Sequence, residues 1–243
     1  MPAPRPALFQ PLLPDARRPL VRWTGLHGSA AALALAEAAR QDDRPWLVIE
    51  PDSRSLERRR AELGFFVREG LPVLTLPDWE VLPWDLFSPL PDIVSERLRT
   101  LAELPGLRRG LVLVTLDTLL QRLAPSGWVA ARSFDLAVGD TLALEAFRMR
   151  LIEAGYASVA QVGAPGEFAV RGSLLDVFPM GTEHPLRIDL FDDRIDAIRR
   201  FDPETQRSLD ALPALRLLPA REFPLDPDAI RAFRRRWRSR FEG

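Results

Sequence analysis

The sequence predicts an α/β fold: a parallel-sheet domain with a degenerate P-loop-like turn, interrupted by a small inserted α+β module. Strand and helix signals alternate through the first half of the chain, as in a parallel sheet with crossover helices. The pattern changes near residue 125 to closely spaced strands and returns near residue 212. The first strands are near-continuous apolar runs, which is typical of strands buried on both faces. They lie at 46–50, 71–76 and 110–116.

Helix patterns lie between these strands, at 53–69 and 91–104. The first helix can begin at Ser53, because serine is favoured as an N-cap. In the second, Asp92 complements the positive end of the helix dipole, and a stripe recurs at helical spacing. We predict that both are crossover helices of the parallel sheet. The stripe consists of Ile93, Arg97, Leu101 and Leu104.

A different alternation follows the turn cluster APSGW. The segment 134–144 is predicted as a short hairpin and 144–156 as one helix. Three strands then follow at about ten-residue spacing, as in a small α+β or β-rich module. These strands are predicted at 167–179, 186–191 and 195–201.

The buried-strand pattern returns at 212–220, and a helix is predicted from Pro227 with Asp226 as its cap, since proline is favoured at the first helical position. This helix has a basic amphipathic pattern with arginine at most positions outside one apolar stripe. We expect the stripe to pack on the parallel-sheet domain and the arginines to be solvated. Docking on nucleic acid is the alternative. The stripe consists of Ile230, Phe233, Trp237 and Phe241.

The stretch before the first helix, LVRWTGLHGSAAALALAEAARQ, begins like a phosphate-binding loop. Gly25 and Gly28 precede an Ala-rich helix, but a Walker A loop requires G-x-x-x-x-G-K-[ST]. The chain contains no lysine at all, so no other lysine can replace the missing one. We therefore predict a degenerate loop at Gly25, Gly28 and Ser29 that could at most hold an anion, without ATP hydrolysis. The residues at the positions of the first Gly, the Lys and the Ser/Thr are Trp23, Ser29 and Ala30.

Composition excludes several other functions. The net charge is −1, which gives no argument for wholesale nucleic-acid or membrane binding. Cysteine is absent and the two histidines, His27 and His184, are far apart, so we predict no catalytic residues, no metal site and no cofactor. The N-terminus is too Pro-rich for a signal peptide, and no apolar run approaches the ~18 residues of a membrane span. We expect a soluble, cytoplasmic chain without a membrane partner.

Four long stretches of the sequence carry a family resemblance, at 76–104, 171–181, 186–208 and 217–224. They resemble the N-terminal region of the bacterial transcription-repair coupling factor family (Mfd), a region that is itself similar to UvrB. The resemblance implies domain 1a, an inserted domain 2 and domain 1b, which we expect at 1–128, 129–209 and 210–243. It also implies a degenerate nucleotide-binding fold without ATPase activity. The motor and RNA polymerase-binding parts of that family lie further along, so we expect this sequence to be part of a longer protein.

The resemblance implies that domain 2 binds UvrA through Arg171, Arg187 and Phe191. Such a module would bring nucleotide excision repair to stalled RNA polymerase, and the full-length protein would also bind double-stranded DNA. Strand alternation places Arg187 and Phe191 on one face with Asp189, while the leucines and isoleucine between them face the core. An exposed phenylalanine flanked by arginine suits an interface. From the residues alone, Phe191 could instead cover the core of its own module.

Two other functions fit the sequence less well. A UvrB-like DNA-binding or damage-recognition module would bind DNA with steep salt dependence, which the near-zero net charge and the single tyrosine, Tyr156, argue against. An ATPase or helicase fragment is disfavoured by the lysine-free loop. The acidic segment 191–196 is interpreted as a hairpin turn at Asp192 and Asp193, because aspartate favours turns.

Overall fold

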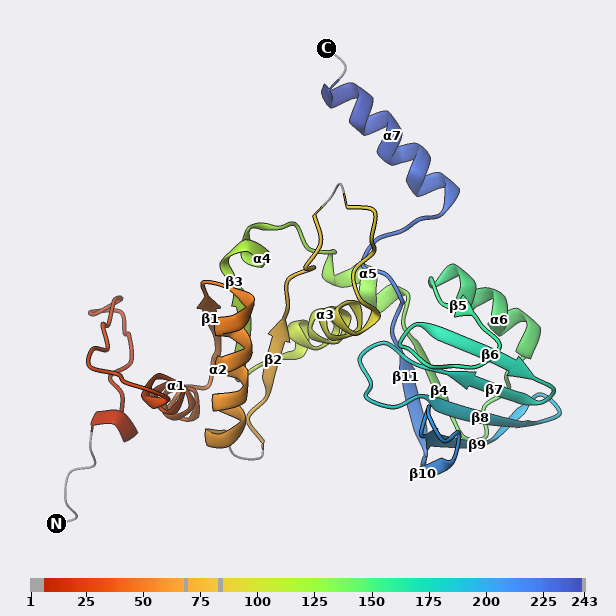
Figure 1. Cartoon of the computed structure of the whole chain (residues 1–243), viewed down its shortest axis with the longest axis horizontal. Coiled ribbons are helices and arrows are strands. Elements are labelled where there is room, and N and C mark those ends of the chain that lie inside the picture. Colours follow the sequence, from red (N-terminus) through yellow and green to blue (C-terminus); the bar gives the residue numbers. More distant parts are fainter. Residues whose placement is uncertain (1–6, 68–69, 83–84, 242–243) are drawn as a thin grey trace. The chain divides into compact units, whose positions relative to one another are not determined.

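The computed structural model describes residues 7–67, 70–82 and 85–241 (Figure 1). The chain divides into two compact units, each of which combines two segments. The first unit combines Met1–Glu80 with Glu103–Arg122, and the second combines Val81–Ala102 with Leu123–Gly243.

Three parallel strands form the sheet of the first unit, in the order β1-β3-β2. All three predicted strands are confirmed. The central strand, β3, is buried along its whole length, as its unbroken apolar run predicts. The strands are β1 (Pro45–Glu50), β2 (Val73–Leu76) and β3 (Gly110–Thr115).

Two helices, α1 (Ala30–Gln41) and α2 (Ser53–Phe66), pack on the sheet of the first unit. Alanines of α1 and leucines of α2 share one apolar cluster with Leu111 and Leu113 of β3. The cap of α2 is Asp52 rather than Ser53, because its Oδ1 accepts a hydrogen bond from the Ser55 amide at 2.7 Å. Shorter helices in the same unit are η1 (Ala7–Phe9), η2 (Leu104–Gly106) and α4 (Leu116–Leu120).

The second unit contains a six-stranded sheet in the order β10-β9-β8-β7-β6-β5. All its neighbours pair antiparallel except β5 and β6. The strands are β5 (Ala157–Ser158), β6 (Glu167–Arg171), β7 (Leu174–Val177), β8 (Leu186–Phe191), β9 (Arg194–Phe201) and β10 (Ser208–Leu212). The helices of this unit are α3 (Pro91–Glu103, through Ala102), α5 (Ser126–Ala131), α6 (Leu144–Glu153) and α7 (Pro227–Phe241).

Two local predictions for this module were wrong. The segment 167–179 is not one strand but two, β6 and β7, which turn back on each other at Gly172 with φ +62°. Glycine suits this turn because it has no Cβ to oppose a positive φ. The segment 134–144 is not a hairpin, because β4 (Phe134–Ala137) pairs with the distant strand β11 (Ala214–Leu217).

One face of the six-stranded sheet forms the core of the second unit. The alternation predicted for β8 is confirmed, since Leu186, Ile188 and Leu190 are all buried. Buried on the same face are Phe168 of β6, Leu175 and Val177 of β7, and Ile195 and Ile198 of β9. A smaller buried cluster on the other face includes Ala169, Phe178 and Phe201. Tyr156 is buried beside this core, where its hydroxyl donates to the Leu218 carbonyl at 2.7 Å, and burial raises its pKa.

Helix α3 carries a buried arginine. Arg97 has no solvent exposure, and its Nε donates to Glu222 Oε1 at 2.6 Å. Ser95 Oγ accepts a hydrogen bond from the Gly181 amide at 2.7 Å. These contacts explain why most of α3 groups with the second unit, although its sequence position between β2 and β3 predicts a crossover helix of the first.

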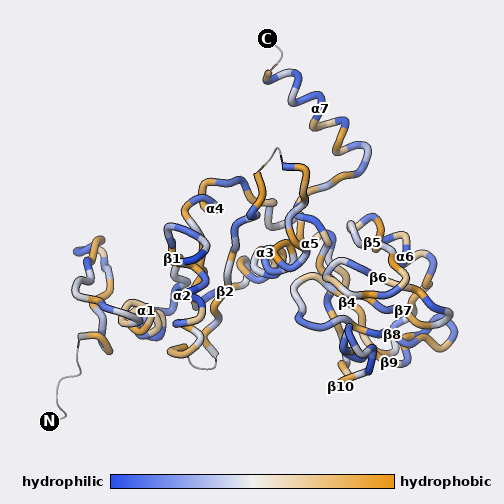
Figure 2. The backbone as a smooth tube through the Cα atoms, in the orientation of Figure 1, coloured by the Kyte–Doolittle hydropathy of each residue, from blue (hydrophilic) through white to orange (hydrophobic). Residues whose placement is uncertain are grey.

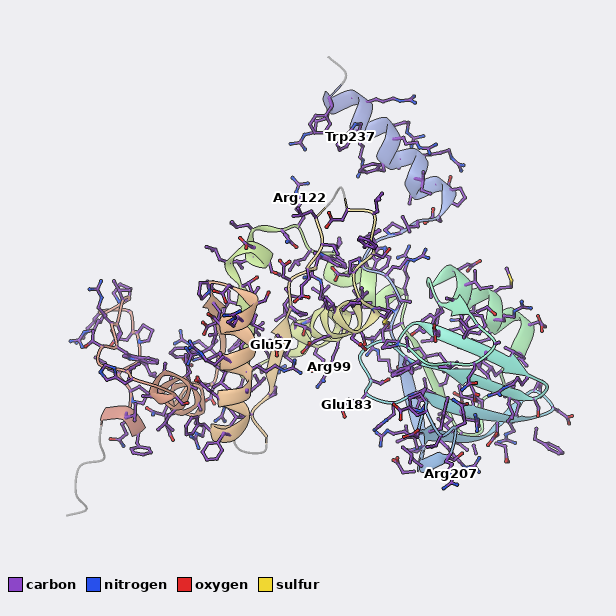
Figure 3. All side chains as sticks on the ribbon, viewed as in Figure 1. Glu57, Arg99, Arg122, Glu183, Arg207 and Trp237 are labelled. Carbon is purple, nitrogen blue, oxygen red and sulfur yellow. The ribbon has the colours of Figure 1, made fainter. Side chains whose placement is uncertain are left out.

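Helix α7 begins at Pro227, as predicted, and Asp226 Oδ1 caps it by accepting from the Ala229 amide at 2.8 Å. None of its described residues is buried, and the aromatic stripe is exposed. Figure 2 shows hydrophilic and hydrophobic residues following one another along α7, and Figure 3 draws its side chains with Trp237 labelled. The stripe therefore lies outside the core of the second unit, and its packing on the parallel-sheet domain stays a prediction. Rings of Phe233 and Trp237 lie 5.7 Å apart between centroids, so neighbouring rings of the stripe contact each other.

Candidate functional site

The outer face of the six-stranded sheet, opposite the core face, carries the predicted partner-binding residues. Register places Asp176 of β7 beside Arg187 of β8, and Arg187 beside Arg199 of β9. One row further along, Leu174 of β7 lies between Arg171 and Asp189. Short strands with tight turns thus bring together side chains from four consecutive strands.

Asp176 is the centre of this face. Its side chain is 1% exposed, and its Oδ1 accepts a hydrogen bond from Arg187 Nε at 2.7 Å. Its Oδ2 accepts from Arg187 Nη2 at 2.9 Å and also from Arg171 Nη2. A buried carboxylate requires such pairing, because its desolvation is otherwise costly. The structure therefore joins two of the predicted residues through a third that sequence reasoning missed.

Arg187 is largely buried. Its side chain is 17% exposed, its Cζ lies 4.7 Å from the centroid of the Phe201 ring, and its Nη1 donates to the Gln206 carbonyl at 3.4 Å. The hydrogen bonds to Asp176 raise its pKa above the ordinary value. Three sets of contacts thus hold this guanidinium on the sheet, which differs from the solvent-facing position that strand alternation suggests.

Arg171 and Phe191 are accessible. Arg171 is 49% exposed and contacts Asp176 through one Nη2. Phe191 is 74% exposed at the end of β8, so it does not cover the core of its module. It lies four residues from Arg187 along the strand, roughly 13 Å at the usual rise. The face therefore offers an arginine cluster and a separate aromatic ring.

The hairpin turn predicted between β8 and β9 is confirmed at Asp192 and Asp193, and Asp192 adopts φ +55°. Aspartate tolerates this left-handed conformation better than most residues. Among the described residues, no cluster of three or more His, Cys, Asp or Glu could hold a metal ion. In the same part of the chain, no helix is long and apolar enough to cross a membrane.

The outer face carries a second ion pair that the sequence did not predict. Arg199 contacts Asp189 across β8 and β9, so their charges are balanced locally. The only signal for Asp176 was a lone carboxylate within the apolar run LLDV. Strand alternation places that carboxylate on the outer face, but its two partners follow from strand register alone.

The degenerate loop lies in irregular backbone before α1, and no strand leads into it. Gly25 and Gly28 have φ values of +72° and +55°, with open space where a Cβ would lie. Ser29 occupies the N-cap position of α1 without a side-chain capping bond. Trp23, which stands at the first glycine position, donates from Nε1 to the Leu12 carbonyl at 3.0 Å. Its ring thus packs within the protein, where a phosphate loop would need open backbone.

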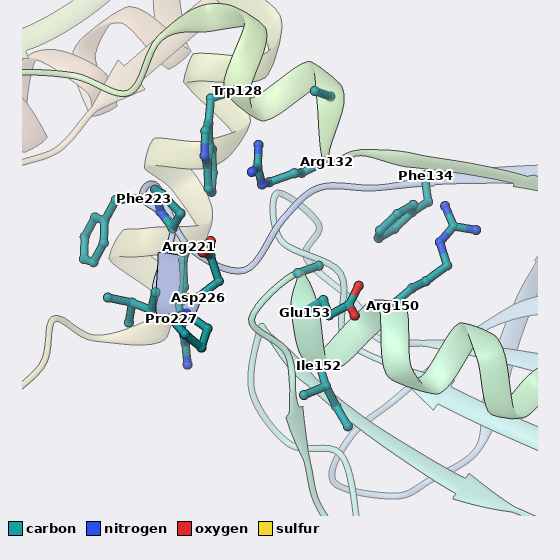
Figure 4. Close-up of a pocket in the computed structure, with 14 residues that line it drawn as sticks. Trp128, Arg132, Phe134, Arg150, Ile152, Glu153, Arg221, Phe223, Asp226 and Pro227 are labelled. Carbon is teal, nitrogen blue, oxygen red and sulfur yellow. The ribbon is translucent and has the colours of Figure 1, made fainter. Parts of the chain in front are cut away.

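A cavity of about 730 Å³ lies within the second unit (Figure 4). Arg132 stacks over Trp128 at 4.7 Å from the ring centroid, and Arg150 stacks over Phe134 at 4.3 Å. Acidic residues, including Glu153, line the same cavity. None of the predicted partner-binding or phosphate-loop residues lines it, and its mixed charges define no single ligand chemistry.

Fold and site together define an α/β chain with a separate, mostly antiparallel sheet module whose open face carries arginine and phenylalanine. Residues 134–223 match the UvrB interaction domain family. The chain belongs to the N-terminal region of the transcription-repair-coupling factor family, and its sheet module is a UvrB interaction domain. This places it in the context of DNA repair.

The relatives that support this assignment are all transcription-repair-coupling factors. The protein of Escherichia coli K12 is 45% identical over 217 residues, which are 89% of this chain and 19% of the relative. That of Haemophilus influenzae is 41% identical over 235 residues, covering 97% of this chain and 20% of the relative. That of Myxococcus xanthus is 36% identical over 208 residues, with 83% and 17% covered. The chain thus spans about a fifth of the length of these curated relatives.

Proposed function

We propose that this chain is a non-catalytic recruitment module that binds UvrA through domain 2. In the full-length protein it would bring nucleotide excision repair to RNA polymerase stalled on double-stranded DNA. We assign domain 1a to 1–128, domain 2 to 129–209 and the start of domain 1b to 210–243. The family assignment supports the repair context, and the resemblance implies the partner.

The observation that carries the proposal is the pair of accessible side chains on the outer face. The side chain of Arg171 is 49% exposed, and a guanidinium can bind a carboxylate through two parallel hydrogen bonds. Phe191 presents a ring that would be desolvated in an apolar pocket, as hot-spot aromatics are. A partner surface with a carboxylate beside such a pocket would match both.

Arg171→Ala and Phe191→Ala should each weaken UvrA binding by about 2 kcal/mol, roughly thirtyfold in Kd, because each removes a side chain expected at the centre of the interface. Binding of purified UvrA to the 243-residue chain measures this, with the melting temperature as folding control. Both variants should melt close to wild type, since the two side chains are exposed.

Matched controls lie elsewhere on the chain. Phe65→Ala removes an exposed ring from α2, and Arg148→Ala removes an exposed guanidinium from α6. Neither should change UvrA affinity. Wild-type affinity in both Arg171→Ala and Phe191→Ala would contradict the proposed function.

We also expect no ATPase activity and weak or absent nucleotide binding. The loop lacks lysine and the Ser/Thr hydroxyl that would contact phosphate and magnesium, and Trp23 replaces its first glycine. Calorimetric titration with Mg-ATP should give no heat of binding, and a phosphate-release assay should give no turnover. Micromolar affinity or steady turnover would contradict this expectation.

A UvrB-like DNA-binding module remains the alternative, and the exposed basic helix α7 favours it. Its aromatic stripe and arginines are both accessible, and such a helix can neutralise phosphates. Binding to a short duplex, measured by fluorescence anisotropy between roughly 50 and 200 mM salt, separates the two functions. Affinity that falls steeply with salt would favour the alternative.

A further inference from the structure

Asp176 lies beneath the accessible arginine and is held in place by the buried one. Arg187 donates to both of its oxygens and is itself fixed by Phe201 and the Gln206 carbonyl. Arg171, by contrast, contacts Asp176 through a single Nη2. The carboxylate is thus anchored on one side and holds a half-exposed side chain on the other.

We infer that Asp176 is a positioning residue for UvrA binding, whose carboxylate holds Arg171 in the orientation that meets the partner. This inference rests on the proposed UvrA-binding function. Arg187 then acts one step further from the interface, because it fixes Asp176 rather than offering its own guanidinium to the partner.

Arg171 has enough N–H donors to bind Asp176 and a carboxylate of the partner at the same time. A guanidinium carries five N–H donors in a planar fork, and Asp176 takes one from Nη2. The remaining donors suffice for a bidentate contact with a second carboxylate. The partner therefore does not need to displace Asp176.

The benefit of this arrangement is preorganisation. An unrestrained arginine has many rotamers, and it loses that freedom when a partner immobilises it. Pairing with a buried carboxylate restricts Arg171 before UvrA arrives. Loss of Asp176 should therefore weaken binding, and it should also shorten the lifetime of the complex, because the bound Arg171 loses the contact with Asp176 that holds it in place.

Asp176→Asn in the full 243-residue chain tests this, because asparagine has the same shape but no charge. We expect the dissociation rate of the UvrA complex, measured by surface plasmon resonance, to rise roughly threefold to tenfold. The lost negative charge makes the outer face more positive, which affects mainly the association rate. A change confined to the association rate would overturn the inference.

Asp189→Asn is the matched control. It removes the same charge from the same face, but its carboxylate holds Arg199 instead of Arg171. Its association rate should change as in Asp176→Asn, while its dissociation rate should stay within about twofold of wild type. An equal rise in dissociation rate for both variants would overturn the positioning role.

The Arg171→Ala background separates positioning from a structural effect. There, Asp176→Asn should add little to the dissociation rate, because the side chain that it positions is absent. If Asp176→Asn does not fold, Asp176→Glu displaces the carboxylate by one methylene and should raise the dissociation rate in the same way. Weaker binding in Arg171→Ala with unchanged dissociation in both Asp176 variants would refute only this inference. Wild-type binding by Arg171→Ala and Phe191→Ala would refute the proposed function.

Discussion

Glu222→Ala should destabilise the chain by about 3–5 kcal/mol, the usual cost of breaking a buried ion pair by removing one member. Its carboxylate receives Arg97 Nε at 2.6 Å and Nη2 at 3.3 Å, and the Arg97 side chain is fully buried. The variant removes the carboxylate that accepts both of these hydrogen bonds. Thermal unfolding should shift downward by roughly 10 °C.

The control for this variant is Glu145→Ala on α6. Glu145 pairs with Arg148 at 3.6 Å, but both side chains are substantially exposed. Exposed pairs contribute about 0–1 kcal/mol, so this variant should melt within a few degrees of wild type. Equal melting temperatures for the two variants would show that the Arg97 pair does not stabilise the second unit.

Arg187→Ala should lower both the stability of the chain and its affinity for UvrA, whereas Arg171→Ala should lower the affinity alone. It removes both hydrogen bonds that Arg187 donates to Asp176, as well as the contact with Phe201. We expect a loss of about 2–3 kcal/mol in the free energy of unfolding. UvrA binding should weaken as well, because Asp176 would no longer be anchored beneath Arg171.

Arg199→Ala controls for the loss of an arginine from the same face. Its ion pair with Asp189 is partly exposed, so both stability and UvrA binding should change little. A wild-type melting temperature for Arg187→Ala would contradict the buried role assigned to Arg187. Undiminished stability with lost binding would instead place its guanidinium directly at the interface.

Much of the fold was predictable because its signals are local. Unbroken apolar runs predicted the three parallel strands, and period-two alternation predicted which side chains of β8 are buried. The cap and proline at the start of α7 predicted its first residue. Each of these patterns reflects a preference that a few neighbouring residues satisfy among themselves.

The sequence was less informative where a strand or side chain pairs with another one far along the chain. The hairpin expected after Phe134 does not form, because β4 finds a partner in β11. Arg97 of α3 is buried, and the carboxylate that pairs with it, Glu222, is 125 residues away. Sequence spacing gives no information about such pairings.

The sequence by itself determined the α/β class, the strands of the parallel sheet, the lack of lysine in the degenerate loop and the resemblance that singles out Arg171, Arg187 and Phe191. Only the tertiary structure decided that these three residues differ in their exposure and in their contacts. It buries Arg187 on Asp176, leaves Arg171 half exposed and places Phe191 apart at a turn. The physical reason is that side-chain alternation follows from one strand alone, whereas burial and ion pairing depend on the register between strands.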